Sequence, residues 1–288
     1  MTDSSEVEVL LDGLTFPEGP RWHDGKLWFS DFGSLSVLTV NLQGSTETVA
    51  EVAQTPCGLG WMPDGTLLVV SMQDRRLLQV DDGGKQRVVA DLSDLAGGPC
   101  NDMVVDAEGR AYIGNTGSYA ALSIDDPPPP TALVCVDPGG RMTVAADHLA
   151  FPNGTVISAD GKVLVVAETF AGRLTAFDVA EDGSLAHRRT FAQFEGALPD
   201  GICLDSEGAI WVADAGPEGH RVLRVFEGGR LERTISVGER TAFACMLGGP
   251  ERQTLFICTC TCFGPDIAQK KGGRIEIIDV EVASAGLP

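Results

Sequence analysis

A four-residue motif recurs along this chain at nearly constant intervals. The clearest copy is Phe151-Pro152-Asn153-Gly154, and the others are Phe16-Pro17-Glu18-Gly19, Thr55-Pro56-Cys57-Gly58, Pro99-Cys100-Asn101-Asp102 and Leu198-Pro199-Asp200-Gly201. A short apolar run follows each copy and ends in a turn that closes on a glycine, namely Gly25, Gly65, Gly109, Gly161 or Gly208. A sixth, degenerate copy begins at Phe243-Ala244-Cys245 and reaches its turn near Arg252. The sequence therefore indicates six copies of one structural unit.

The period of this repeat indicates the fold class. The turn glycines are separated by 40, 44, 52 and 47 residues. A period in the forties with several short strands per unit is typical of a β-propeller blade. The first unit has strand patterns at Lys26 to Phe29, Ser36 to Val40 and Glu47 to Val52, and helical spacing of apolar residues is hardly seen. We predict an all-β, six-bladed β-propeller in which residues 1–288 form a single domain.

The alternating segment from Glu6 to Leu11 precedes the first copy of the repeat. An open propeller would leave sheet edges unpaired, and unpaired edges favour aggregation. We therefore expect this N-terminal segment to pair with the strands near Arg274 to Val282 in the last blade and to close the ring.

The charge balance excludes several classes of partner. The chain has 41 acidic and 21 basic residues, a net charge of -20, which repels nucleic acids and anionic lipid surfaces. The N-terminal residues lack the pattern of a signal peptide, and no apolar run approaches the roughly 18 residues of a membrane span. We expect a cytoplasmic protein, a monomer or small homo-oligomer, that acts on a small-molecule substrate without nucleic-acid or membrane partners.

The eight cysteines are interpreted as thiols of a reducing compartment. Cys258, Cys260 and Cys262 alternate along one expected strand, so they would point to one face and could bind a metal. No C-x-x-C motif or nearby histidine supports that alternative. We therefore interpret these cysteines as small buried hydrophobic residues, with a metal or redox role as the alternative.

The repeated motif also predicts a site. The first strand of every propeller blade lines the central channel, so equivalent positions form a ring around the axis. Here the ring consists of Glu18, Cys57, Asn101, Asn153, Asp200 and approximately Ala244. Two carboxylates and two carboxamides suit a hard cation such as Ca²⁺, Mg²⁺ or Mn²⁺, whereas zinc usually recruits His or Cys. The alternative is that Asn, Asp and Gly only mark turns.

Further polar residues are expected near this ring. The second strand of each blade returns to the same face, and its polar end residues are expected to form hydrogen bonds there: Asp31, Ser71, Asn115 with Thr116, and Asp214. The longest insertion contains Asp125-Asp126-Pro127-Pro128-Pro129-Pro130, which must be stiff and extended. It is either a plain surface loop or a lid that carries Tyr119. Asn101, Thr116 and Tyr119 are our candidate substrate contacts.

Taken together, these motifs resemble those of the regucalcin/gluconolactonase family of six-bladed propellers, which also includes calcium-dependent organophosphate hydrolases. The resemblance extends from Phe16-Pro17-Glu18-Gly19-Pro20 to Gly272-Gly273-Arg274-Ile275 and so covers essentially the whole chain. It implies a lactonase-like metallohydrolase.

The resemblance also implies specific roles. One divalent cation would be held by Glu18, Asn153 and Asp200, with Asn101 as a fourth ligand or a substrate contact. Ca²⁺ is the first choice, with Mn²⁺, Mg²⁺ and Zn²⁺ as alternatives. Asp200 would be the catalytic carboxylate.

Two departures from the family pattern narrow these expectations. Sugar-lactonases of this kind commonly place an Arg two residues before the Asn at 101, where this chain has Pro99. The organophosphate hydrolases hold a second, structural calcium with an Asp where this chain has Cys203. We therefore expect a single metal and a substrate that need not be a sugar-acid lactone.

The function predicted from the sequence is metal-dependent hydrolysis of a lactone or related small ester, which makes the protein a carboxylic ester hydrolase. The metal would polarise the carbonyl group while Asp200 activates water as general base, and direct nucleophilic attack by Asp200 stays open. Two alternatives come from other classes. One is a non-catalytic calcium-binding regulatory or scaffold propeller, and the other is a metal-free propeller resembling strictosidine synthase.

Overall fold

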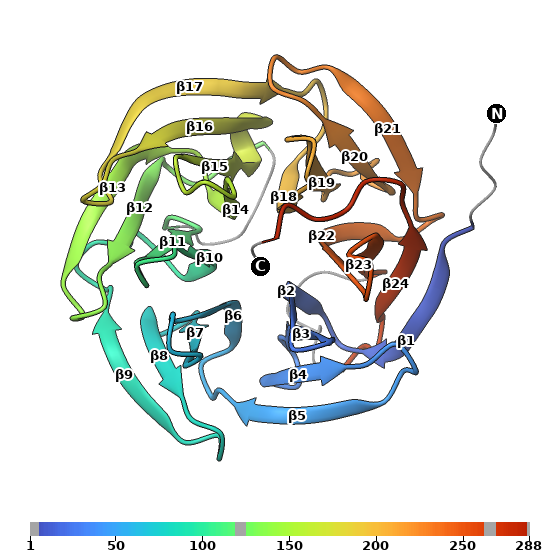
Figure 1. The fold of residues 1–288 in the computed structure, drawn as a ribbon, viewed down its shortest axis with the longest axis horizontal. Coiled ribbons are helices and arrows are strands. Elements are labelled where there is room, and N and C mark those ends of the chain that lie inside the picture. The colour runs from blue at the N-terminus through green and yellow to red at the C-terminus, as the bar shows by residue number, and fades with distance from the viewer. Residues whose placement is uncertain (1–5, 119–124, 262–268, 287–288) are drawn as a thin grey trace.

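The computed structural model describes residues 6–118, 125–261 and 269–286. Within these ranges, 24 β-strands form six four-stranded antiparallel sheets. The sheets radiate from a central axis as the blades of a propeller, with the first strand of each repeat nearest the axis (Figure 1). The predicted all-β, six-bladed propeller is therefore confirmed. In the part of the chain so described, no helix has the length and hydropathy that crossing a membrane requires.

The first three blades follow the chain order. Blade 1 contains β2 (Pro17–His23), β3 (Lys26–Asp31), β4 (Ser36–Val40) and β5 (Thr46–Glu51). Blade 2 contains β6 (Pro56–Trp61), β7 (Leu67–Ser71), β8 (Arg76–Val80) and β9 (Gln86–Asp91). Blade 3 contains β10 (Cys100–Val105), β11 (Ala111–Asn115), β12 (Thr131–Val136) and β13 (Met142–Leu149).

The other three blades have the same layout. Blade 4 contains β14 (Pro152–Ile157), β15 (Val163–Glu168), the short 3₁₀ helix η1 (Thr169–Ala171), β16 (Arg173–Val179) and β17 (Leu185–Gln193). Blade 5 contains β18 (Pro199–Leu204), β19 (Ile210–Asp214), β20 (Arg221–Val225) and β21 (Leu231–Ser236). Blade 6 contains β22 (Thr241–Gly248), β23 (Thr254–Cys260), β24 (Gly273–Asp279) and, as its outermost strand, β1 (Glu8–Leu14).

Apolar cores lie between neighbouring blades. Between blades 2 and 3, for example, Leu68 and Val70 pack in one cluster with Met103 and Ile113, all of them at most 3% exposed. Each sheet has two faces against other sheets, so its central strands are apolar on both faces instead of alternating. The outermost strands are largely exposed and polar, as in the pattern of β5.

The N-terminal strand closes the ring. β1 is antiparallel to β24, with Glu8 opposite Ile277 and Leu14 opposite Gly273. The blade is therefore completed by segments from the two ends of the chain, as the alternating N-terminal pattern predicts. Arg274 reinforces this pairing, because its guanidinium donates to Asp12 Oδ2 at 2.9 Å.

Carboxylates at the ends of second strands hold the loops that enter the first strands. Asp31 accepts hydrogen bonds from the backbone N–H of Phe16 at 2.7 Å, and Asp214 accepts one from Leu198 N–H at 3.0 Å. The expectation that these residues form strand-end hydrogen bonds is confirmed. Ser71 and Asn115 form strand-end hydrogen bonds as well: the Ser71 hydroxyl donates to Asp74, and the Asn115 carboxamide donates to Ala132 O.

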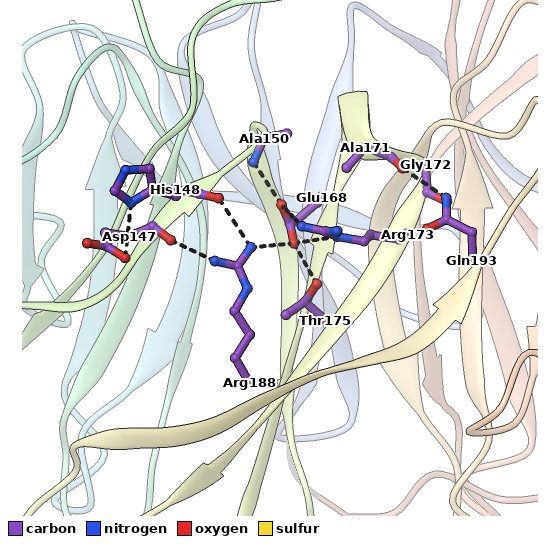
Figure 2. Close-up of polar contacts among 10 residues, drawn as sticks. All are labelled: Asp147, His148, Ala150, Glu168, Ala171, Gly172, Arg173, Thr175, Arg188 and Gln193. Carbon is purple, nitrogen blue, oxygen red and sulfur yellow. Dashed lines mark hydrogen bonds and ion pairs between the residues drawn. The ribbon is translucent and has the colours of Figure 1, made fainter.

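Glu168, at the same position in blade 4, has the densest set of such contacts (Figure 2). Its carboxylate accepts from Ala150 N–H at 2.9 Å, from Thr175 Oγ1 at 2.5 Å, and from the guanidinium groups of Arg173 and Arg188 at 2.8 and 3.1 Å. These hydrogen bonds outweigh the effect of burial and lower the pKa of Glu168 below its ordinary value. The Glu168 carboxylate therefore holds the loop that leads into Phe151, because it binds the backbone N–H of Ala150.

Deleting the closing strand should expose the outer edge of β24. We expect a truncation that starts at Asp12 to aggregate and to melt at a lower temperature than the full chain, because the last sheet loses the first four of the seven residues of its outermost strand. Light scattering and a thermal melt followed by circular dichroism would measure this. A truncated protein that stays monodisperse with an unchanged melting temperature would contradict the closure role.

Replacing Glu168 should test its anchoring of the blade 4 loop. We expect Glu168→Gln to lower the free energy of unfolding by about 1–3 kcal/mol at pH 7, because two arginines lose an ionised partner. The control is Glu47→Gln, which removes an exposed ion pair with Lys26 and should have almost no effect.

The pH dependence has a definite sign. The pKa of Glu168 is lowered in the folded state, so its stabilisation is present above the ordinary value of 4.5 and is lost as the pH falls through the lowered pKa. Urea titrations at pH 7 and below pH 4 would measure the difference. A deficit for Glu168→Gln that is equal at both pH values would contradict this account.

Candidate metal centre

The polar ring positions occupy equivalent places in the innermost strands. Glu18, Asn101, Asn153 and Asp200 are each the second residue of their strand, in β2, β10, β14 and β18. Their side chains are largely buried, and each residue is between 4% and 8% exposed. Neighbouring innermost strands contact one another around the axis. The fold therefore brings residues from four blades to one end of the channel.

A β-bulge at each ring position explains how these side chains are directed. In blade 4, Pro152 pairs with Glu168 and Thr155 pairs with Val166, so the first strand carries one extra residue beside Asn153. Blades 2, 3 and 5 have the same irregularity at the ring position, and in blade 1 it lies directly after Glu18. Bulges bend a strand and redirect a side chain, and they are frequent next to functional sites.

The glycine after the ring position has a steric cause. A Cβ atom on Gly154 would lie 2.5 Å from Asp200 O, and one on Gly201 would lie 2.4 Å from Ala244 Cβ. Neighbouring blades thus approach each other so closely that a side chain is excluded. The glycine of the motif serves packing, and the residue before it is available for chemistry.

Two contacts orient the carboxamides. Asn153 Nδ2 donates to Thr169 Oγ1 at 3.1 Å, and the Thr169 hydroxyl donates to Pro199 O at 2.8 Å, in the motif that carries Asp200. Cys57 Sγ donates to Asn101 Oδ1 at 3.1 Å. Thr169 was not singled out by sequence reasoning. The sequence feature that could have identified Thr169 is its position directly after Glu168, the last residue of β15. Thr116 has the equivalent position after Asn115, the last residue of β11.

Burial, with repulsion from neighbouring carboxylates, raises the pKa values of both Glu18 and Asp200. For Glu18 burial is the larger cause and the charge of Asp200 the next, and the pKa lies well above its ordinary range. Burial, with a further contribution from the charge of Asp102, raises the pKa of Asp200 to about 8, while contact with Asn153 opposes the shift. Among the described residues, neither carboxylate forms an ion pair with Lys or Arg. Two buried acids therefore share a site without a cationic side chain of their own.

This donor set fits a hard divalent cation. Glu18 and Asp200 supply two negative charges, and Asn101 and Asn153 add neutral oxygen donors, a combination that Ca²⁺, Mg²⁺ and Mn²⁺ accept. No three His, Cys, Asp or Glu side chains form a metal-binding group within residues 6–118, 125–261 and 269–286. Any metal at the ring would thus depend on the carboxamide oxygens, which suits zinc least.

A buried ion pair lies beside the ring and was not identified from the sequence. Arg21 Nη2 donates to Asp102 Oδ1 at 2.7 Å, and the two side chains are 5% and 7% exposed. Burial raises the pKa of Asp102, and the charge of Arg21 opposes that shift. The sequence feature that could have drawn attention to this pair is Asp102 itself, which stands where four other copies of the motif have glycine.

The other candidate residues have mixed outcomes. Thr116 is buried and its hydroxyl donates to Pro99 O at 3.3 Å, so a role as substrate contact stays a prediction. Tyr119 and Cys262 lie outside the described residues. Cys258 and Cys260 lie in β23, and every cysteine that the structure describes is buried.

The fold and this ring define a class of protein, a six-bladed β-propeller with an oxygen-donor site at one end of its channel. The family described as SMP-30/gluconolactonase/LRE-like region matches residues 16–261. The chain belongs to this family, as the resemblance seen in its motifs predicts.

Individual relatives agree with the assignment. Regucalcin of Xenopus laevis is 27% identical over 279 residues, which cover 91% of this chain and 89% of that protein. Regucalcin of Danio rerio is 30% identical over 173 residues, which span 59% of this chain and only 57% of that protein.

Solved structures share the fold. A luciferin-regenerating enzyme superimposes with a TM-score of 0.82 at 18% identity, covering 99% of both chains. A gluconolactonase from Xanthomonas campestris gives 0.75 at 22% identity, covering 96% of this chain and 90% of that one. The calcium-binding protein regucalcin from Agrobacterium tumefaciens gives 0.80 at 22% identity, with 97% and 95% covered.

Proposed function

We propose that this chain is a divalent-metal-dependent hydrolase of a lactone or related small ester. The observation that carries the proposal is the pair of buried carboxylates, Glu18 and Asp200, of which neither forms an ion pair with Lys or Arg among the described residues, while the charge of Asp200 repels that of Glu18. Such a pair is stable in its ionised form only beside added positive charge. Membership of a family that includes gluconolactonases supports lactone hydrolysis as the use of that charge.

The roles of the residues follow from their chemistry. Glu18, Asn153 and Asp200 would hold one divalent cation, with Asn101 as fourth ligand or as substrate contact. When bound, the ion supplies positive charge that polarises the substrate carbonyl and stabilises the negative charge developing on its oxygen. Thr169 keeps Asn153 in place, so the ring is held by hydrogen bonds before substrate binds.

Asp200 is the residue that we propose to act on the reacting atoms. It works in its ionised form, which burial disfavours and neighbouring positive charge favours. In that form it accepts the proton of an attacking water molecule or attacks the carbonyl carbon itself. Both routes need a carboxylate at this position, and a carboxamide can perform neither.

A non-catalytic calcium-binding propeller is the second candidate. The observation that favours it is that the structurally similar regucalcin of Agrobacterium tumefaciens is a calcium-binding protein. The four oxygen-bearing side chains of the ring would suffice for binding alone. A metal-free propeller resembling strictosidine synthase fits less well, because it leaves Glu18 and Asp200 uncompensated.

We expect the substrate to be a lactone or a related small ester. Pro99 stands where related sugar-lactonases carry Arg, and its carbonyl accepts from the Thr116 N–H at 2.9 Å, so this loop offers no guanidinium to a sugar acid. A test panel should therefore include aliphatic lactones and aryl esters beside aldonolactones. We place the reaction in the cytoplasm, as a prediction from the sequence.

Acid release from this panel, followed with a pH indicator, tests the proposal. We expect activity with Ca²⁺, Mn²⁺ or Mg²⁺ and loss of activity after verified metal removal. Asp200→Asn should keep the fold and bind metal, yet lose kcat by on the order of 10²- to 10⁴-fold, because an amide can neither accept a proton nor attack. Glu18→Gln, the matched control, should mainly weaken metal affinity and be rescued in part by excess cation.

Both variants would be assayed after calorimetry shows full metal occupancy. A near-normal kcat for Asp200→Asn together with an inactive Glu18→Gln would reverse the assigned roles. A wild-type protein that binds calcium and hydrolyses nothing in the panel would favour the non-catalytic alternative. Full activity without metal would contradict the metal mechanism.

A further inference from the structure

Asp102 occupies the position directly after the ring residue, where four other copies of the motif have glycine. The residue after the ring position is glycine in four copies of the motif, because the next blade leaves no room for a side chain. A Cβ on Gly58, for instance, would lie 2.5 Å from Met103 N. In blade 3 the tight approach occurs on the second strand instead, where a Cβ on Gly114 would lie 2.3 Å from Pro152 O. Space at residue 102 is thereby left for a carboxylate.

Arg21 reaches that carboxylate from a blade that is not its neighbour. It extends from β2 in blade 1 to β10 in blade 3, where Nη2 contacts Asp102 Oδ1 and also donates to Met103 O. Nη1 donates to its own neighbour Pro20 O at 2.8 Å. The guanidinium also lines a small cavity of about 10 Å³ with Thr155 and other residues of the inner strands. Arg21 therefore lies among the innermost strands of the propeller.

The charges of this region can be counted. Three buried carboxylates interact electrostatically, since the charge of Asp102 acts on both Glu18 and Asp200. One cationic side chain, Arg21, is paired with Asp102 and acts on Glu18 as well. When all four groups are ionised, as a bound cation would favour, they carry two negative charges together. Without Arg21 they would carry three.

We propose that Arg21 is a specificity-determining residue for the charge of the bound ion, because its pairing with Asp102 leaves the ring with the two negative charges that match a divalent cation. The inference rests on the proposed metal site. It assigns Arg21 no contact with the ion or the substrate, and its effect is transmitted through the field of the ion pair.

A purely structural role explains this pair less well. Buried ion pairs contribute little net stability, and well-packed apolar residues often replace them without loss. The blades already associate through apolar clusters such as the one between blades 2 and 3. A charged pair is retained here beside two further buried carboxylates, where its electric field acts on the same small region.

The test compares Ca²⁺ with Tb³⁺, an ion of similar coordination chemistry and one more charge. Dissociation constants for both ions would be measured on the purified full chain by calorimetry and Tb³⁺ luminescence, for the wild type and four variants: Arg21→Met, Arg21→Lys, Asp102→Asn and the double variant Arg21→Met/Asp102→Asn. Each ratio of the two constants reports ion preference independently of catalysis. Melting curves would establish that each variant is folded.

The expected ratios follow the charge count. With Asp102 kept ionised by the bound ion, Arg21→Met adds a net negative charge and should shift preference toward Tb³⁺ by about tenfold, the effect of one charge at an assumed separation of roughly 10 Å in a medium of effective dielectric constant near 20. Asp102→Asn should shift preference toward Ca²⁺ by a similar factor. Arg21→Lys and the double variant keep the net charge and should keep the wild-type ratio.

The outcomes separate this inference from the proposed function. If the wild type binds calcium and the ratio is the same in Arg21→Met and Asp102→Asn as in the wild type, the charge-matching role is wrong. If Arg21→Met fails to fold, the opposite predictions for Asp102→Asn and the double variant still decide the question. A wild type that binds neither ion would overturn the metal site itself, and the inference with it.

Discussion

Closure of the ring forces the innermost strands into contact near the axis, and the other features of the site depend on that contact. Gly154 and Gly201 lie where a Cβ would meet the next blade at 2.5 Å or less. A bulge beside each glycine turns the preceding side chain away from the regular alternation of the strand. One packing requirement, repeated around the ring, thus collects Glu18, Asn101 and the other ring residues at one end of the channel.

The same contact removes water from the ring and makes its charges costly. Burial is the largest cause of the raised pKa values of Glu18 and Asp200; the charge of Asp200 adds to the shift of Glu18, and the charge of Asp102 adds to that of Asp200. Folding energy from the apolar interfaces between blades must offset that cost. Thr169 and Cys57 hold the carboxamides by hydrogen bonds at the same time. We infer that the ring is organised for a cation before one arrives, which favours binding because little ordering remains to be done.

Much of the fold was readable from spacing, because a propeller repeats one local pattern. The interval between turn glycines predicted six blades, and the alternation from Glu6 to Leu11 predicted closure against the last blade, observed as β1 against β24. The clusters around Glu168 and Arg21 were not predicted. The Arg21 ion pair joins residues 81 positions apart in blades 1 and 3. The Glu168 cluster gathers side chains from adjacent strands of blade 4. In both cases an arginine has no sequence signature that names its partner. Tyr119 lies outside the described residues, and its role as a substrate contact stays a prediction.

The central claim is that ring closure builds a cation site from oxygen donors of four blades. The most direct measurement is a crystal structure of the protein grown with Mn²⁺, with anomalous scattering used to locate the ion. The account predicts one strong peak at the ring, within coordination distance of Glu18, Asn153 and Asp200, about 2.0–2.6 Å for oxygen ligands of such ions. A ring without an anomalous peak at saturating Mn²⁺, or a peak held by other residues, would contradict it.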